Sequence, residues 1–274
     1  MKKSICLSFL GLKGGSGKTI ISTNIAYVLA SAGNKVLVID ADPQGNATLT
    51  LSPKNKKDPG LFYPAMNEFL LDRGIGALDV IVTDTIDQNI HLLPNNLRAA
   101  QAALRIEPLV AIGQVMKRLQ PIMQNYDYVI FDGRPEDAGL FINLAMICSD
   151  YVIVPIDGTY GASSLSALLD LIDDMKNWNA KLELLGVVLN HWMPQRIQAK
   201  QLKEYLKAQY PEVYVFNQTI PTSEQIRRTQ VMGRTLPVVI GESISPSFKK
   251  LAKEIIKTIE SREKEKNDQN TYLY

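Results

Sequence analysis

A glycine-rich run near the start of the chain holds the residues best suited to chemistry. Residues 11–19 read Gly-Leu-Lys-Gly-Gly-Ser-Gly-Lys-Thr, between an apolar β-like run and a helical pattern, and predict a phosphate-binding loop of the G-x-x-x-x-G-K-[ST] kind. Glycines let successive backbone N–H groups curve round an anion, which the positive end of the following helix also faces. Lys18 would reach the β- and γ-phosphates of a nucleotide, and the Thr19 hydroxyl would ligate Mg²⁺. The residues expected to bind nucleotide here are Gly14, Gly15, Ser16, Gly17, Lys18, Thr19 and Ile20.

Three aspartates follow two further apolar runs. Asp40 and Asp42 stand two residues apart at the end of the run 36–39, so in an extended chain they share a face. Asp132 ends the apolar run 128–131, a Walker B pattern that would hold Mg²⁺ through water. Because ligands of open α/β sheets bind at the carboxyl ends of the strands, all three are expected beside the phosphates. A carboxylate there can position an attacking water or hold the water shell of the metal.

The elements that must position these residues alternate along the chain. Short apolar runs and longer stretches of helical periodicity predict a doubly wound α/β fold, a mostly parallel sheet with helices on both faces. Strands are expected over 4–10, 35–39, 90–94, 128–131, 151–155, 184–190 and 214–219. Helices are expected near 18–32, 97–103, 109–126, 139–148, 162–177, 198–210 and 247–266. With no repeat period and no linker, one domain is expected over 1–266, followed by a frayed tail over 267–274.

The composition narrows the class of protein further. The 274 residues include 30 Lys and Arg against 28 Asp and Glu, a net charge of +2 that gives no global reason to expect nucleic acid. Two cysteines and two histidines lack metal-ligand spacing, so a zinc site is not expected and free thiols suit a reducing cytosol. No segment approaches the roughly 18 apolar residues that span a bilayer. A cytoplasmic protein is therefore expected.

Lys13 is a second lysine inside the loop, which a generic phosphate loop does not need. With it, residues 13–19 resemble the K-G-G-x-G-K-[ST] loop of the ParA/MinD family of deviant Walker ATPases. Residues 40–46, Asp-Ala-Asp-Pro-Gln-Gly-Asn, resemble the D-x-D-P-Q-G-N motif of ParA proteins. The resemblance implies that Lys13 crosses a dimer interface to contact the nucleotide of the partner subunit. It also implies that Asp40 orients the hydrolytic water while Asp42 supports the magnesium environment.

The likeness to this family extends over nearly the whole chain. Residues 91–97, 151–155 and 220–222 match its strand ends, which implies that Asn190 and Pro221 line an adenine pocket. For Asn190 an ordinary strand-end asparagine is an equal alternative. The chain departs from the family at Thr222, where relatives carry arginine, and over 133–136, where Gly-Arg-Pro-Glu replaces a small residue and Pro-Pro.

A basic surface is predicted in the second half of the chain. Residues 190–234 hold seven basic and three acidic side chains, a local net charge of +4. Positions 196, 200, 203 and 207 are spaced by four, three and four, so a helix would align them in a stripe that can contact phosphates without reading sequence. A solvated helix face is the alternative. By the resemblance, the expected DNA-binding residues are Arg196, Lys200, Lys203, Arg227 and Arg228.

The resemblance implies a ParA-like ATPase whose ATP- and Mg²⁺-dependent sandwich dimer binds DNA non-specifically on the nucleoid. A ParB-like or adaptor protein would stimulate hydrolysis and so segregate a plasmid or chromosome partition complex. Alternative cargoes are protein organelles such as carboxysomes, and a non-hydrolysing scaffold is a further alternative. An alternative of another class is a metabolic or assembly ATPase of the nitrogenase-reductase type, but such a protein would need cysteines as cluster ligands.

Residues 165–178 are a candidate partner-facing helix. Membrane docking is not expected, because residues 260–268 offer no apolar face.

Overall fold

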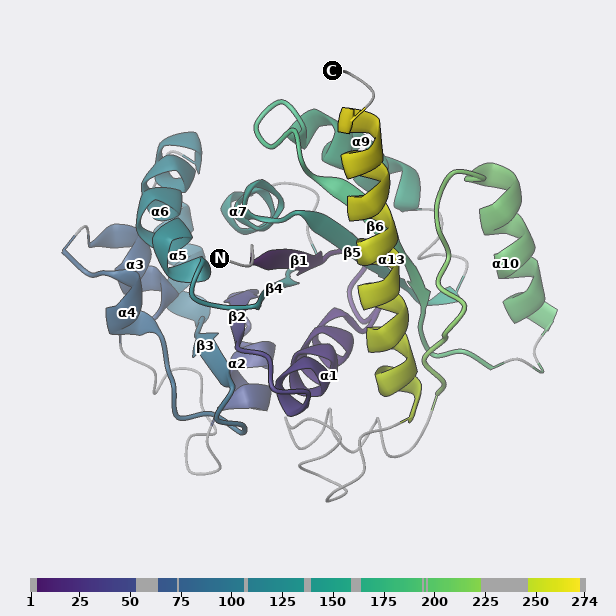
Figure 1. Ribbon diagram of the computed structural model, residues 1–274. Helices are drawn as coiled ribbons and strands as arrows, with labels where there is room; N and C mark the ends of the chain where they lie inside the picture. The colour runs from purple at the N-terminus through teal and green to yellow at the C-terminus, as the bar shows by residue number, and fades with distance from the viewer. Residues whose placement is uncertain are drawn as a thin grey trace.

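The computed structural model describes residues 4–52, 64–72, 74–105, 108–135, 139–158, 164–193, 195, 197–222 and 246–271. Six parallel strands form one sheet in the order β3-β2-β4-β1-β5-β6 (Figure 1). Their bounds are β1 Ile5–Phe9, β2 Val36–Ala41, β3 Ile90–Leu93, β4 Tyr128–Gly133, β5 Tyr151–Ile156 and β6 Glu183–Leu189. Because helices cover both faces, these strands are continuous apolar runs rather than alternating ones.

The helices follow the doubly wound pattern that the sequence predicts, and this fold class is confirmed. The helices over the sheet are α1 Lys18–Ser31, α6 Pro108–Met123, α7 Leu140–Cys148, α9 Leu165–Met175, α10 Ile197–Gln209 and α13 Pro246–Thr271. Shorter helices are α2 Asn46–Leu51, α3 Met66–Leu71, α4 Ala77–Val80 and α5 Leu97–Ala103. Helix α13 is the longest of them, but it is too polar to cross a membrane. No helix among the described residues is both long enough and apolar enough to do so.

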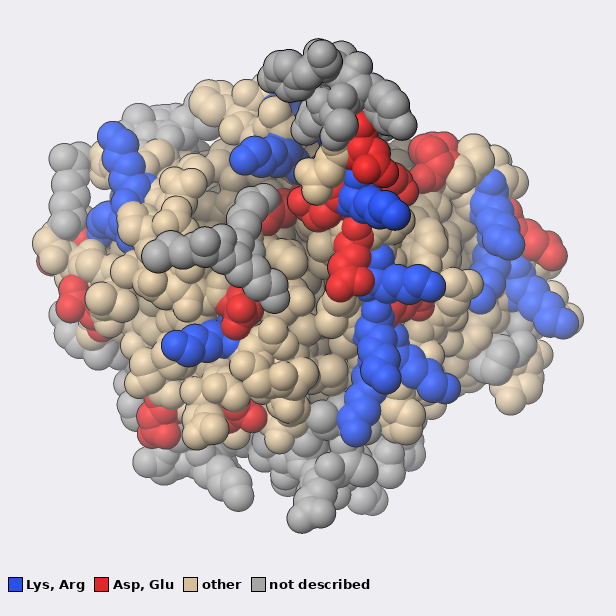
Figure 2. All heavy atoms as spheres, in the orientation of Figure 1, with Lys and Arg blue, Asp and Glu red and all other residues tan. Residues whose placement is uncertain are grey.

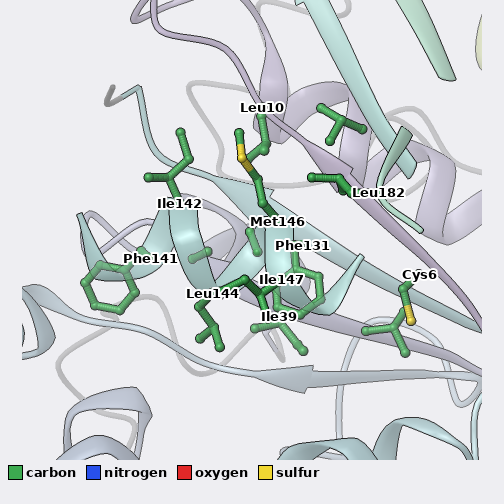
Figure 3. Close-up of a cluster of buried hydrophobic side chains, with 14 of the residues drawn as sticks. Cys6, Leu10, Ile39, Phe131, Phe141, Ile142, Leu144, Met146, Ile147 and Leu182 are labelled. Carbon is green, nitrogen blue, oxygen red and sulfur yellow. The ribbon is translucent and has the colours of Figure 1, made fainter. Parts of the chain in front are cut away.

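Successive side chains of the strands point alternately into two hydrophobic cores, one on each face of the sheet. Leu7 and Phe9 of β1 point toward α1 and α13, whereas Cys6 points into the core on the opposite face. In that second core the side chains of α7 lie over the sheet, and Figure 3 shows Met146 near Leu10 and Ile147 near Ile39 and Phe131. The sheet is thus held rigid from both sides, which fixes the positions of its strand ends.

Three expectations about the elements need correction. Residues 214–219 do not form a strand, because Val215 makes only an isolated bridge to Val187. The short helices α2, α3 and α4 were not predicted, since each is too brief to show a helical period. Helix α13 runs on to Thr271, so the predicted start of the frayed tail at residue 267 is wrong.

Gly186 in β6 lets the segment after α10 lie close against the sheet. A Cβ at this position would lie 2.6 Å from the carbonyl oxygen of Tyr214 and 2.9 Å from Cε2 of Phe216. Both neighbours are constrained, because the Tyr214 carbonyl accepts from the N–H of Val187 and Phe216 is fully buried. A methyl group added at Gly186 would therefore meet atoms that cannot easily move away.

We expect Gly186→Ala to lower the free energy of unfolding by about 1–3 kcal/mol, the usual cost of overpacking a core. Gly113→Ala in α6 is the matched control, because nothing lies within 4 Å of the added methyl group. Alanine is a better helix former than glycine, so this variant should be unchanged or more stable by up to about 1 kcal/mol. Urea unfolding of both variants measures the difference, and equal effects would show that the close approach of residues 214–216 is not tightly packed.

Candidate active site

The phosphate loop connects β1, in the interior of the sheet, to the start of α1. Gly15 and Gly17 adopt left-handed backbone conformations, with φ of 76° and 94°. Helix α1 begins at Lys18 without a side-chain cap, so its first N–H groups remain available to an anion. The expected motif needs one correction, because five residues rather than four separate Gly11 from Gly17 and Leu12 stands at the first glycine position. The loop matches the K-G-G-x-G-K-[ST] form instead.

The ammonium group of Lys18 lies inside the loop. Its Nζ donates to the carbonyl oxygens of Gly11 at 3.1 Å and Lys13 at 2.9 Å. Only 6% of the residue is exposed, and burial lowers the pKa of the ammonium group although Asp132 and Asp42 attract its charge. A buried cation of this kind, beside bare N–H groups, fits a bound polyphosphate.

Thr19 and Asp132 are brought together as expected for a magnesium site. The Thr19 hydroxyl donates to Oδ2 of Asp132 at 2.7 Å, and the Ser22 hydroxyl donates to Oδ1 at 2.8 Å. Burial raises the pKa of Asp132 to about 6, although both hydroxyl groups oppose this. Hydroxyl and carboxylate oxygens are the donors that Mg²⁺ prefers. Ser22 was missed in the sequence, although its spacing of three from Thr19 places it on the same helix face.

Asp40 has a different environment from the one expected for a residue that orients water. It is fully buried, and its Oδ2 accepts from both the N–H and the hydroxyl of Thr48, each at 2.7 Å. Its Oδ1 accepts from the N–H of Asp42 at 3.1 Å, and Asn95 donates to its carbonyl oxygen. Burial, and then the charge of Asp132, raise the pKa of Asp40 well above its usual range. The carboxyl group therefore anchors the start of α2 to the sheet.

Asp42 is a further carboxylate near the phosphate loop. Its Oδ1 accepts from the N–H of Gln44 at 2.9 Å, and its charge acts on Lys18 and on Asp132. The residue is 7% exposed, so it lies at the edge of the site rather than beneath it. The surroundings of Asp40 and Asp42 therefore differ, and the roles that the resemblance implies for them stay predictions.

The expected base-binding side of the site lies at the end of β6. Nδ2 of Asn190 donates to the carbonyl oxygen of Ser16 at 2.8 Å, which ties β6 to the phosphate loop. Within the described residues, three buried oxygens there have no hydrogen-bond partner: Ser16 Oγ, Asn190 Oδ1 and Thr222 Oγ1. Pro221 is held beside them by a bridge to Trp192. Unpaired buried polar atoms around one loop are costly, and a nucleotide would supply their partners.

Lys13 lies at the rim of the loop. Its Nζ lies 3.4 Å from the carbonyl oxygen of Asp157, which follows β5, and the carboxylate of Asp157 lies 3.2 Å from Nδ1 of His191. The contact of Lys13 with a partner subunit stays a prediction. Ile20 packs into the core between the sheet and α1, so it can offer a ligand only its backbone.

The predicted DNA-binding residues fall into two groups. Lys200 and Lys203 lie on α10, where Lys200 is exposed and the Lys203 ammonium lies 5.1 Å from the Trp192 ring centre. Arg196, Arg227 and Arg228 lie outside the described residues. The described residues thus include only two members of this set, and DNA binding by it stays a prediction.

The loop, the buried lysine and the hydroxyl–carboxylate pair on a doubly wound parallel sheet define a P-loop nucleotide-binding protein. Residues 3–184 match the model of a family described as an AAA domain. The chain is 31% identical to the sporulation initiation inhibitor protein Soj of Bacillus subtilis, over 89% of this chain and 94% of Soj. This chain belongs to the ParA/MinD family of ATPases.

Solved structures agree with this fold. The cell division ATPase MinD of Pyrococcus furiosus is 25% identical with a TM-score of 0.69, over 93% of this chain and 99% of that chain. An ATP complex of a McdA variant from Cyanothece is 22% identical with a TM-score of 0.77, over 94% of this chain and 97% of that chain. The second likeness shows the fold alone.

We expect Thr48→Val to lower the free energy of unfolding by about 1–3 kcal/mol, because it leaves the buried Asp40 carboxyl group short of a donor. The same hydroxyl accepts from the N–H of Asn95 at 2.9 Å, so a second buried group loses its partner. Thr50→Val is the matched control in the same helix, since that hydroxyl donates only to the carbonyl oxygen of Asn46. It should cost less than about 1 kcal/mol. Equal losses in urea unfolding would contradict the anchoring role of Asp40.

Proposed function

We propose that this protein is an ATP- and Mg²⁺-dependent ATPase that dimerises on ATP, binds DNA non-specifically and positions or segregates a cargo. The observation that carries the proposal is the phosphate loop with Lys18 inside it and the Thr19–Asp132 pair beside it. Membership of the ParA/MinD family supports ATP as the nucleotide. Partition-type names among the relatives support a plasmid or chromosome partition complex as the cargo.

Each polar group of the site has a task in hydrolysis. Lys18 and the loop N–H groups bind and orient the phosphates, and Asn190 with Pro221 holds the base. Thr19 and Asp132 would hold Mg²⁺, which when bound neutralises charge on the phosphates. Asp42 orients the attacking water, because its carboxylate lies at the loop while that of Asp40 is engaged by α2. Slow basal turnover with stimulation by a ParB-like or adaptor protein is proposed from the membership of the ParA/MinD family.

The dimer is proposed to close through Lys13. This lysine lies at the rim of the loop, half-buried, on the edge of the sheet where a second subunit would meet the nucleotide. Its ammonium group would then contact phosphates of the partner subunit. Nucleotide binding and dimerisation become one event, and the DNA-binding surfaces of two subunits act together in the cell interior, on the nucleoid.

Substitution of the two aspartates separates their roles. Asp42→Asn should lower ATP turnover by about 100-fold or more while ATP binding persists, because the amide cannot accept a proton from water. Asp40→Asn should keep turnover within about tenfold of wild type, since the surroundings of Asp40 already favour an uncharged group. Phosphate release and fluorescent-nucleotide binding measure the two effects. The opposite ranking would return the hydrolytic role to Asp40, and negligible turnover by wild type with its partner present would point to a scaffold instead.

Lys13→Ala should abolish ATP-dependent dimerisation without abolishing ATP binding by the monomer, because the side chain acts across the interface. Light scattering with a non-hydrolysable ATP analogue gives the mass of the particle. Lys35→Ala, which removes an exposed lysine at the start of β2, is the control and should dimerise like wild type. A dimeric Lys13→Ala variant would contradict the proposed interface.

A further inference from the structure

Helix α13 carries a row of exposed lysines that is separate from the basic stripe on α10. Lys249, Lys250, Lys253 and Lys257 are all exposed, and Figure 2 shows basic side chains gathered along one half of this helix. The opposite side of the same turns is apolar and packs against α1 in the core, through Phe248, Leu251, Ala252, Ile255 and Ile259. We call the four lysines the α13 row.

Charge along α13 is strongly uneven. The only acidic residue among the turns of the α13 row is Glu254, and it is turned toward the neighbouring segment. Its carboxylate accepts from the Tyr214 hydroxyl at 2.7 Å and from the N–H groups of Asn217 and Gln218 at 2.7 and 2.9 Å. In the part of the chain that the structure describes, none of the four ammonium groups forms an ion pair. The row therefore presents its charge to solvent.

A groove runs beside the α13 row. It has a volume of about 600 Å³ and lies between α13 and the segment around Tyr214 and Asn217. Three basic side chains, Lys253, Lys257 and Arg262, line it together with hydroxyl and amide side chains and two carboxylates. Of these carboxylates, that of Glu254 is engaged by the Tyr214 hydroxyl and by backbone N–H groups. Cations and hydrogen-bond donors along a polar groove are suited to phosphate groups.

The arrangement of the row favours the backbone of a nucleic acid over a membrane surface. A surface-bound amphipathic helix must bury an apolar face in lipid, but the apolar face of α13 is already occupied by α1. Residues 249, 253 and 257 repeat every four positions, so their side chains follow one line at intervals of about 6 Å over about 12 Å. A line of regularly spaced cations matches a line of phosphates.

The row also lies in the half of α13 that is nearer the nucleotide site. The other half is fixed at the starts of β5 and β6, where the Tyr151 hydroxyl donates to Glu263 at 2.6 Å and Lys266 pairs with Glu183 at 2.9 Å. The first half therefore points toward the opposite edge of the sheet, where the phosphate loop lies. Surfaces at this edge of two subunits approach one another when a dimer closes over it.

We propose that the α13 row contacts the phosphate backbone of duplex DNA and carries most of the electrostatic affinity of the dimer. This inference rests on the DNA binding proposed above and specifies its surface. None of the residues predicted from the sequence to bind DNA lies on this helix. Binding of this kind is independent of base sequence and falls steeply with salt concentration.

The test compares two triple variants with the same change of charge. Lys249→Gln/Lys253→Gln/Lys257→Gln removes the three lysines that are spaced by four, and Lys35→Gln/Lys117→Gln/Lys181→Gln removes three exposed lysines away from α13. DNA affinity is measured by fluorescence anisotropy on duplexes of two unrelated sequences, with ATP analogue, over a range of salt. We expect the row variant to lose about tenfold or more in affinity on both duplexes, and its salt slope to fall by about 3 per bound subunit. The control variant should bind like wild type.

The remaining outcomes distinguish this inference from the proposed function. If wild type binds DNA and the row variant binds equally well, or if both triple variants lose affinity equally, the α13 row is not the contact surface while the proposed function stands. If wild type binds no DNA in any nucleotide state, the proposed function fails and the inference falls with it. Unchanged basal ATP turnover and thermal unfolding of the row variant show that its fold is intact. Loss of wild-type binding to phosphatidylglycerol vesicles in the row variant would overturn DNA as the partner.

Discussion

Asp40 and Asp132 are register partners on the neighbouring strands β2 and β4, and neither carboxyl group reaches solvent. Burial raises the pKa of both carboxyl groups, and the charge of Asp132 raises that of Asp40 further. The cost is offset by donors from two helices, since α1 supplies Thr19 and Ser22 to Asp132 and α2 supplies Thr48 to Asp40. The positions of both helices, and with them the phosphate loop, follow from the need to satisfy this pair.

The sequence allowed the fold class and the phosphate side of the site to be predicted, because both depend on local patterns. Continuous apolar runs mark buried parallel strands, and the glycine–lysine–threonine pattern marks the loop between the first strand and helix. The different surroundings of Asp40 and Asp42 were beyond such patterns. Two residues that share a strand face are equivalent in sequence, and only the packing of α2 shows that one is buried under Thr48 and the other faces Lys18. Thr48 and Asn95 gave no signal, because their partners are distant in the chain.

The contact between Asn190 and the phosphate loop joins the two ends of the site. A Cβ on Gly17 would lie 1.9 Å from Nδ2 of Asn190, so only glycine permits this approach. Gly17 also has a positive φ, which favours glycine. Both the backbone conformation and the nearby Asn190 side chain therefore require glycine at this position. Since Asn190 follows β6 and the loop follows β1, the residue proposed to hold the base directly contacts the backbone proposed to hold the phosphates.

The net charge of +2 conceals the electrostatic character of the surface. Salt screens the interaction of exposed charges that lie more than about 8–10 Å apart. A DNA backbone therefore interacts with the charged side chains in its contact area rather than with the total charge of the protein. The lysines of α13 were visible in the sequence between the apolar positions 248, 251, 255 and 259, whose period places them on the opposite face. The DNA site predicted from the sequence instead comprises the basic stripe on α10 and the pair Arg227 and Arg228. Under the proposed function, a monomer with one such row would bind DNA weakly because few phosphates are neutralised, whereas a dimer would double the number of contacts in one particle. Nucleotide-controlled dimerisation would then switch DNA affinity without any change in the row itself.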